Sequence, residues 1–205
     1  WTPDSTPEPP APLPRPYNTA AFFNEVRRSC FGGSLKQSQV DGINTIGEYL
    51  MEMDVPNMKL EMAAYLFATF QWETASTMQP IEEYGGKKAR YAPWYGRGYV
   101  QLTWESNYRK QQDKLRTHPL REQGVPYRVH DDPNLALNPH TSALISVYGC
   151  LDGDFTGKKL SDYIKPGSVD YVNARRVVNG TDRANEIADY AKRWERALRA
   201  GFEHA

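Results

Sequence analysis

Residues 60–73 read LEMAAYLFATFQWE, and the apolar side chains of this segment recur at Leu60, Ala63, Ala64, Phe67 and Phe70. Apolar residues spaced by three and four positions share one face of an α-helix. The segment predicts a strongly apolar helix that starts near residue 57 and ends at about 73–76. It also contains the longest nearly apolar run of the chain, 62–70, which is far shorter than the roughly 20 residues that a membrane crossing needs.

Helical periodicity extends to both sides of this segment. The sequence predicts a helix over about 34–50, with Ser34 as its N-cap, followed by a break at Val55–Pro56. A last helix is predicted over about 182–200, where apolar residues again recur on one face.

A further helix is predicted to begin at Asn138, because Asn is a good N-cap and Pro139 suits the first helical turn. This helix should end at about Gly149. Only residues 98–103 alternate convincingly, as a β-strand does. The sequence therefore predicts an α-dominated domain in which two lobes enclose a groove, with at most a small β element.

Composition excludes several classes of function. The chain carries 25 Lys and Arg residues against 25 Asp and Glu residues, whereas nucleic-acid-binding proteins usually have a basic excess that neutralises phosphates. No nucleic-acid partner is therefore expected. The four histidines are scattered and share no helical face with a carboxylate, so neither a metal nor another cofactor is expected. The two cysteines, Cys30 and Cys150, either pair with each other or are both buried thiols.

The first residues differ from the rest. Seven prolines fall within residues 1–16, between Thr, Ser, Glu and Asp residues unsuited to a core. Such a composition is typical of a stiff, solvated linker. The chain starts at Trp1 without the features of a signal peptide. We therefore expect residues 1–16 to be a linker from an upstream domain, and residues 17–205 to be one folded domain.

Glu73 is the first residue that suggests chemistry. Residues three, four and seven positions before it are Phe70, Thr69 and Leu66, so its carboxyl group shares a helix face with apolar side chains. Burial among such neighbours favours a protonated carboxyl group, which can act as a general acid. The alternative is a helix-end carboxylate that turns to solvent, which is the commoner case on periodicity alone.

Two more carboxylates, Glu82 and Glu83, follow in an irregular segment. Glycoside hydrolysis needs two carboxyl groups beside the scissile bond, one to protonate the leaving oxygen and one to activate water or stabilise the sugar cation. A helix-end Glu that faces a loop Glu across a cleft would satisfy this need. The alternative, with equal weight, is a surface loop with solvated acids.

Residues 94–108 read WYGRGYVQLTWESNY. Tyr and Trp rings stack on sugars, and the side chains of Gln101, Thr103 and Asn107 can hydrogen-bond to hydroxyl and acetamido groups. The glycines lack the spacing of a phosphate-binding loop. Alternatively, the aromatic residues belong to the core, and Thr103 only caps a helix that starts at Trp104.

Residues 95–108 resemble the signature Y-G-R-G-x-x-Q-L-[ST]-x-x-x-N-Y of glycoside hydrolase family 19 chitinases and related phage endolysins. Residues 70–74, FQWET, resemble the family's H-E-T segment, and residues 177–180, VVNG, its late I-N-G segment. Residues 37–44 and 77–81 look more like bacterial and phage lysozyme-like members than plant chitinases. The resemblance implies a lysozyme-like catalytic domain with two helical lobes around a substrate cleft.

The resemblance also implies roles for the candidate catalytic residues. Glu73 matches the general acid. Glu82 matches the second carboxylate, because phage members carry an acidic residue about nine positions after the acid, and Glu83 is the reserve. Thr103 matches the Ser or Thr that positions the attacking water.

Substrate-binding roles follow by the same matching, for Tyr95, Gln101, Trp104, Asn107 and Asn179. Two positions depart from the family pattern. Trp72 stands where the family usually has His. The arginine that chitinases place in the final helix has two candidates here, Arg183 and Arg193.

Three functions are compatible with these features. The favoured one is a peptidoglycan hydrolase, a muramidase that cleaves the β-1,4 bond between N-acetylmuramic acid and N-acetylglucosamine. It would be made in the bacterial cytoplasm and act in the periplasm or cell wall, as a phage endolysin or as a secreted antibacterial effector with an immunity protein as partner. The alternatives are a chitinase of the same fold and a catalytically silent glycan-binding module.

Overall fold

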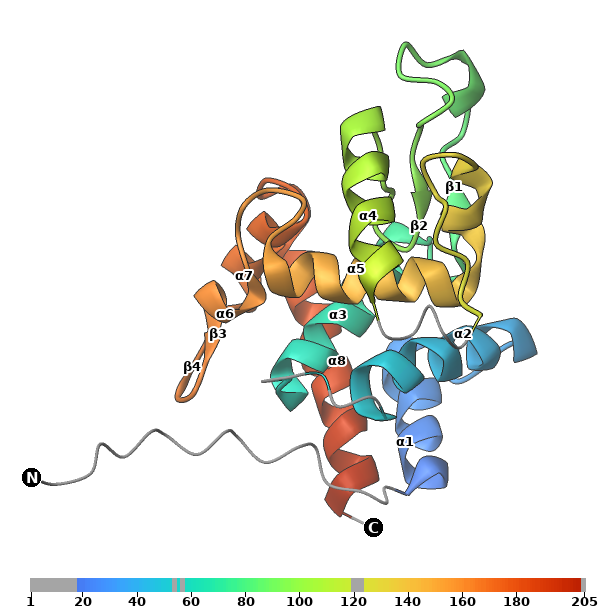
Figure 1. Cartoon of the computed structure of the whole chain (residues 1–205). Helices are drawn as coiled ribbons and strands as arrows, with labels where there is room; N and C mark the ends of the chain where they lie inside the picture. The colour runs from blue at the N-terminus through green and yellow to red at the C-terminus, as the bar shows by residue number, and fades with distance from the viewer. Residues whose placement is uncertain (1–17, 53–54, 56–57, 119–123, 204–205) are drawn as a thin grey trace, which may run out of the picture.

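The structure is a computed structural model that describes residues 18–52, 55, 58–118 and 124–203 (Figure 1). Three predicted features lie outside the described residues: the proline-rich segment 1–16, Pro56 of the predicted break, and the predicted start of the apolar helix at 57. Among the described residues, helices account for most of the regular structure, and the strands form two short two-stranded sheets.

One lobe is a bundle of helices around α3, Leu60–Glu73. Helix α1, Thr19–Glu25, continues into a π-helical turn, Val26–Cys30, and helix α2, Gln37–Gly47, continues into another, Glu48–Glu52. The C-terminal helix α8, Ala184–Glu203, packs mainly on α3 and α1. Figure 1 shows this bundle in the lower half of the molecule.

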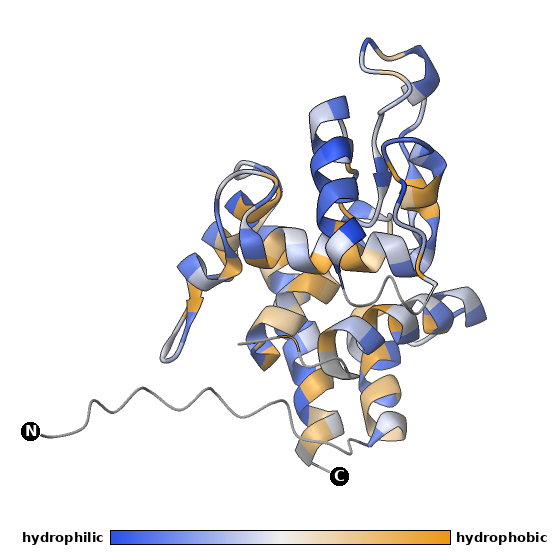
Figure 2. Cartoon of the chain, viewed as in Figure 1, coloured by the Kyte–Doolittle hydropathy of each residue, from blue (hydrophilic) through white to orange (hydrophobic). Residues whose placement is uncertain are grey.

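The second lobe rises above α5, Pro139–Asp152, which runs across the middle of the view in Figure 1. It contains the antiparallel strands β1, Ile81–Glu82, and β2, Arg97–Gly98, and the helix α4, Glu105–Thr117. Short 3-10 turns lie at Gly86–Lys88 and Pro133–Leu137. Figure 2 shows α4 as predominantly hydrophilic, as expected for a helix on the surface of this lobe.

A third group of short elements follows α5. It consists of α6, Leu160–Tyr163, the hairpin of β3, Ile164–Lys165, with β4, Ser168–Val169, and then α7, Tyr171–Ala174. Helix α7 passes directly into a 3-10 turn, Arg175–Val177, which leads towards α8. Together the elements confirm the predicted α-dominated fold with two lobes and a small β content.

Helix α3 is buried on all sides, since every residue from Met62 to Gln71 has little or no solvent exposure. The ring of Trp194 stacks on Phe67 with 4.6 Å between centroids, and its indole nitrogen donates to Gln71 Oε1 at 2.9 Å. Gln71 Nε2 in turn donates to the Cys30 carbonyl oxygen at 3.0 Å. These buried hydrogen bonds fix the register of α3 against α8 and the segment after α1.

The helix predictions hold with small corrections. Asn138 caps α5 as predicted, because its side-chain oxygen accepts from the backbone N–H groups of His140 and Thr141. Ser34 is not the N-cap of α2. That place belongs to Lys36, whose backbone N–H donates to the Gln39 side chain at 2.8 Å.

The predicted strand over 98–103 is wrong in extent. Only Arg97–Gly98 is a strand, and most of the residues that follow form turns because Gly98 and Gln101 both have positive φ values. Strand β1 and the β3–β4 hairpin were not predicted, since two-residue strands are too short to produce an alternating pattern.

Both cysteines are free thiols, which decides between the two alternatives that the sequence left open. Burial raises the pKa of the Cys30 thiol to about 12, and burial likewise raises the pKa of Cys150. In the described part of the chain, no helix is long and apolar enough to cross a membrane. Within the same residues no group of three His, Cys, Asp or Glu side chains is placed to hold a metal ion.

Asp154, just beyond α5, anchors helix α4. Its carboxylate accepts hydrogen bonds from Lys114 Nζ at 2.5 Å and from Gln111 Nε2 at 3.0 Å, and pairs with Lys110 at 2.9 Å. Burial alone would raise the pKa of Asp154, but the hydrogen bonds from Lys114, Gln111 and Lys110 outweigh it and hold this pKa below its ordinary value.

Replacing Asp154 by Asn should therefore destabilise the fold at neutral pH by about 1–3 kcal/mol. Because the folded-state pKa is lowered, the stabilisation is present above the unfolded-state pKa and is lost as the pH falls below about 4. Urea unfolding at pH 7 and pH 3 measures both values. The control is Asp152→Asn, which removes an exposed partner of Lys114 and should cost about 0–1 kcal/mol. An equal loss for Asp154→Asn at both pH values would contradict the assignment.

Candidate active site

Glu73 is the last residue of α3, and its carboxylate forms an ion pair with Arg175. Arg175 Nη1 donates to Glu73 Oε1 at 2.5 Å, and Arg175 Nε donates to the Asp182 carbonyl oxygen at 3.1 Å. The arginine side chain is 3% exposed and the glutamate side chain 17%. The surroundings of Glu73 therefore differ from the apolar ones that periodicity suggested, because its nearest polar partner is a buried guanidinium.

Neither candidate for the family's late arginine lies beside Glu73. Arg183 pairs with Glu186 at 3.0 Å, and the Arg193 guanidinium lies over the Tyr190 ring at 5.4 Å. Arg175 is the partner that sequence reasoning missed. It lies just before the matched segment 177–180, and that position was the only signal in the sequence.

The β1–β2 hairpin separates Glu82 from Glu83. Ile81 pairs with Gly98 and Glu82 with Arg97, and the next residue, Glu83, donates its backbone N–H to the Gly96 carbonyl oxygen at 2.7 Å. Because successive residues of an extended chain point to opposite faces, the two carboxylates face opposite ways.

Glu83 is held firmly on its face. Its carboxylate accepts from the Gly96 N–H at 3.0 Å and from the Tyr91 hydroxyl at 2.8 Å. A Cβ atom added to Gly96 would lie 2.9 Å from Gln101 Oε1 and 3.3 Å from Glu83 Oε2. Glu83 and Gln101 therefore share the space above Gly96.

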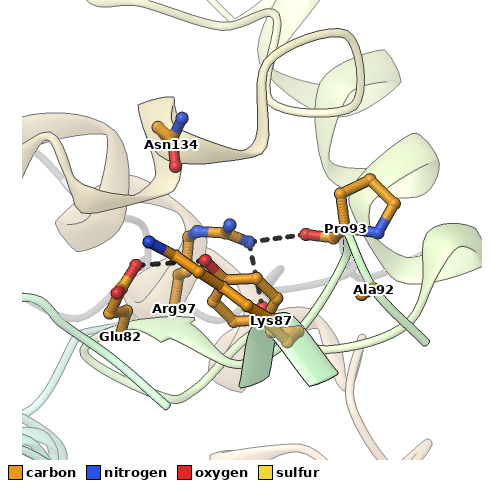
Figure 3. A pocket seen from close by; sticks show the side chains of 7 residues that line it. Glu82, Lys87, Ala92, Pro93, Arg97 and Asn134 are labelled. Carbon is orange, nitrogen blue, oxygen red and sulfur yellow. Dashed lines mark hydrogen bonds between the residues drawn. The ribbon is translucent and has the colours of Figure 1, made fainter. Parts of the chain in front are cut away.

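Glu82 lies on the other face, where its carboxylate accepts from the Tyr95 hydroxyl at 3.2 Å. It lines a cavity of about 320 Å³ together with Tyr95 and Arg97 (Figure 3). The Arg97 guanidinium covers the Tyr95 ring at 3.7 Å, and Tyr95 is only 4% exposed. The structure thus does not offer the Tyr95 ring for stacking on a sugar.

A second, smaller pocket of about 120 Å³ collects most of the predicted substrate-binding residues: its wall includes Gln101, Thr103, Trp104, Asn107, Phe155 and Val178. Thr103 Oγ1 donates to the Gln101 carbonyl oxygen at 2.8 Å, and Asn107 Nδ2 donates to the Thr103 carbonyl oxygen at 2.8 Å. Trp104, rather than Thr103, is the N-cap residue of α4. The alternative reading of Thr103 as a helix cap is therefore wrong.

Neither carboxylate lines this pocket, but contacts lead to its wall from both Glu83 and Glu73. On one side Tyr91 links Glu83 to Trp104, because its hydroxyl donates to Glu83 and its ring lies 4.8 Å from the Trp104 ring. On the other side the backbone N–H of Val178 donates to the Arg175 carbonyl oxygen at 3.2 Å. Asn179 follows as an exposed residue whose side-chain oxygen accepts from the Gly180 N–H.

The backbone is strained around this pocket. Gln101 and Trp104 have φ values of 55° and 77°. The φ values of Ala75, Ser76 and Met78, shortly after Glu73, are positive too. A non-glycine residue in this region costs about 1–3 kcal/mol, and such strain clusters at functional sites. Gln101 and Trp104 both line the pocket, which makes it the candidate active site.

Comparisons with known proteins agree with the fold. No family model and no curated protein matches the sequence. Among solved structures, chitinase C from Streptomyces griseus HUT6037 matches with a TM-score of 0.50 and 18% identity, over 87% of this chain and 90% of that chain.

Two further structures match less closely. A glutamate-to-glutamine mutant of chitinase C matches with a TM-score of 0.46 and 15% identity, over 89% of this chain and 91% of that chain. A bacterial family 19 chitinase matches with a TM-score of 0.47 and 16% identity, over 87% and 93%. The chain has the lysozyme-like fold of chitinase C, as the sequence resemblance implied.

A double-mutant cycle on Glu73 and Arg175 tests the ion pair. Arg175→Met and Glu73→Gln should show a coupling energy of about 1–3 kcal/mol in urea unfolding, because either single change leaves a partly buried charge without its partner. Arg176→Met is the matched control, since Arg176 is exposed, and it should change stability by less than about 0.5 kcal/mol. Additive effects of the two changes would contradict the pairing.

Proposed function

We propose that this protein is a glycoside hydrolase that cleaves the β-1,4 bond between N-acetylmuramic acid and N-acetylglucosamine in peptidoglycan. The observation that carries the proposal is that two firmly held carboxylates contact neighbours of one pocket: Glu83 shares the space above Gly96 with Gln101, and Arg175, the partner of Glu73, is hydrogen-bonded to Val178. Two carboxyl groups beside the scissile bond are the requirement for general acid–base glycoside hydrolysis.

Glu73 is the proposed general acid. In its protonated form Glu73 gives its proton to the glycosidic oxygen and becomes a carboxylate as the sugar–oxygen bond breaks. Arg175, 2.5 Å away, then stabilises the negative charge that forms on Glu73. The proton that the general base removes from water passes through solvent to Glu73 and restores the acid for the next turnover.

Glu83 is the proposed general base, because it shares the Gly96 side of the hairpin with Gln101. Thr103 assists by orienting the water. Its hydroxyl proton is engaged by the Gln101 carbonyl oxygen, so a lone pair on Oγ1 accepts a hydrogen bond from the water while Glu83 removes the water's other proton. Glu82, the residue that family spacing selects, is the competing assignment.

Two features favour peptidoglycan over chitin. The Arg90 guanidinium lies over the Trp104 ring at 5.3 Å and brings a positive charge to the pocket wall. Peptidoglycan carries carboxylates and chitin is uncharged, so only peptidoglycan gains from this charge. The second feature is the resemblance of residues 37–44 and 77–81 to phage and bacterial lysozyme-like sequences.

Such a substrate implies action in the periplasm or cell wall after synthesis in the bacterial cytoplasm. An endolysin and a secreted antibacterial effector both fit this route. In the second case an immunity protein would be a partner. A domain upstream of residues 1–16 would serve delivery or wall binding.

Three glutamine variants test the catalytic assignment. Glu73→Gln and Glu83→Gln should each lower kcat by on the order of 100-fold to 10,000-fold, because each removes a proton-transfer group. Glu82→Gln should leave kcat within a few-fold of wild type. Mass spectrometry of products from purified sacculi and, separately, from chitin oligomers measures the reaction.

The products also distinguish the alternatives. Hydrated reducing-end muropeptides support the muramidase. Cleavage of chitin oligomers alone would make the protein a chitinase, and folded wild type that binds glycan without cleaving it would be a binding module. Loss of kcat in Glu82→Gln with Glu83→Gln unaffected would return the second carboxylate to Glu82.

A further inference from the structure

The cavity on the Glu82 face of the hairpin is a second site that the proposed reaction does not use. Its volume of about 320 Å³ is within the range of small-molecule sites. Figure 3 shows the side chains of Lys87, Glu82 and Asn134 arranged around the Arg97 guanidinium. Two cations, one carboxylate and one amide thus face a common space.

Arg97 is the charged group of this set that is buried. It is 3% exposed, yet it forms no ion pair with any described residue. Its hydrogen bonds within the described residues all run through Nη1, to the carbonyl oxygens of Pro93 and Tyr95 and to the Tyr108 hydroxyl. Its Nε is buried and has no partner there.

Apart from the Tyr95 ring, the Arg97 guanidinium contacts only neutral oxygen acceptors. A buried cation is costly, and proteins usually compensate it with an anion. Glu82 does not supply that compensation, because its carboxylate is hydrogen-bonded to Tyr95 and forms no ion pair with Arg97 or Lys87 in the described part of the chain. The cavity therefore has a net positive charge and unused hydrogen-bond donors. A carboxylate of a ligand would complement both.

We propose that this cavity binds the peptide stem of peptidoglycan through a carboxylate group. Lys87 and Arg97 hold the carboxylate, and Glu82 and Asn134 accept from an ammonium or amide group of the same peptide. This inference rests on the proposed function, since it assigns a recognition site for the substituent that distinguishes peptidoglycan from chitin.

The position of the cavity suits a substituent of a bound glycan. The β1–β2 hairpin has the Glu83 side next to the glycan pocket and the Glu82 side next to the cavity. Paired strands are about 4.8 Å apart, whereas an extended peptide of four residues spans about 13 Å. A stem that leaves a sugar in the pocket is therefore long enough to pass around the hairpin.

Binding of a free stem peptide tests the inference without relying on catalysis. The probe is the tripeptide L-alanyl-γ-D-glutamyl-diaminopimelic acid, titrated into the whole chain and followed by NMR. Lys87→Met should raise the Kd of the tripeptide about tenfold or more, which is the effect expected for the loss of one charged hydrogen bond. Lys88→Met is the matched control, because Lys88 is the exposed neighbour that does not line the cavity, and it should leave the Kd unchanged.

Kinetics on two substrates give a second readout. Lys87→Met should raise KM about tenfold for peptide-bearing glycan strands but leave KM for strands stripped of peptide unchanged. Asn134→Ala should change KM in the same selective way. No tripeptide binding by wild type, or equal effects of Lys87→Met and Lys88→Met, would overturn the inference while leaving the hydrolase intact. Tripeptide binding without cleavage of either glycan would overturn the proposed hydrolase and support the binding site.

Discussion

The complete burial of helix α3 is the constraint on which the rest of the structure depends. Trp194 stacks on Phe67 and hydrogen-bonds to Gln71, so the helix cannot turn or slide without opening the core. Glu73 emerges from the end of this fixed helix. Arg175, delivered by the turn after α7, then meets it at 2.5 Å. The hydrophobic core thus positions one carboxylate of the proposed site, and one buried arginine orients it.

The β1–β2 hairpin determines the direction of the other carboxylates, because successive side chains along a strand point to opposite faces. Glu83 is turned towards the glycan pocket with Gln101, and Glu82 towards the cavity with Arg97. The close approach of Gln101 requires a glycine at position 96, since a Cβ atom there would collide with Gln101. A hairpin of two short strands therefore separates the proposed catalytic carboxylate from the proposed recognition site.

Sequence patterns predicted the parts that depend on local spacing. Residues 60–73 form the helix that their apolar periodicity indicates, and Asn138 caps α5 as its chemistry suggests. The pairing of Glu73 with Arg175 joins residues 102 positions apart, and no local pattern encodes it. The division between Glu82 and Glu83 depends on strand register, which spacing from Glu73 does not specify. The burial of the Tyr95 ring under Arg97 was not predicted either, because motif matching names residue types and not the direction of their side chains.

A water molecule activated by Glu83, on the opposite side of the sugar from Glu73, would invert the configuration at the anomeric carbon. Proton NMR of the first products from peptidoglycan glycan strands, recorded before mutarotation, reads this configuration directly. The paired carboxylates predict that cleavage of the β-1,4 bond releases the α-anomer. Release of the β-anomer would contradict the assignment of Glu83 as a base that activates water, and release of a 1,6-anhydro sugar would indicate that Glu73 acts without Glu83.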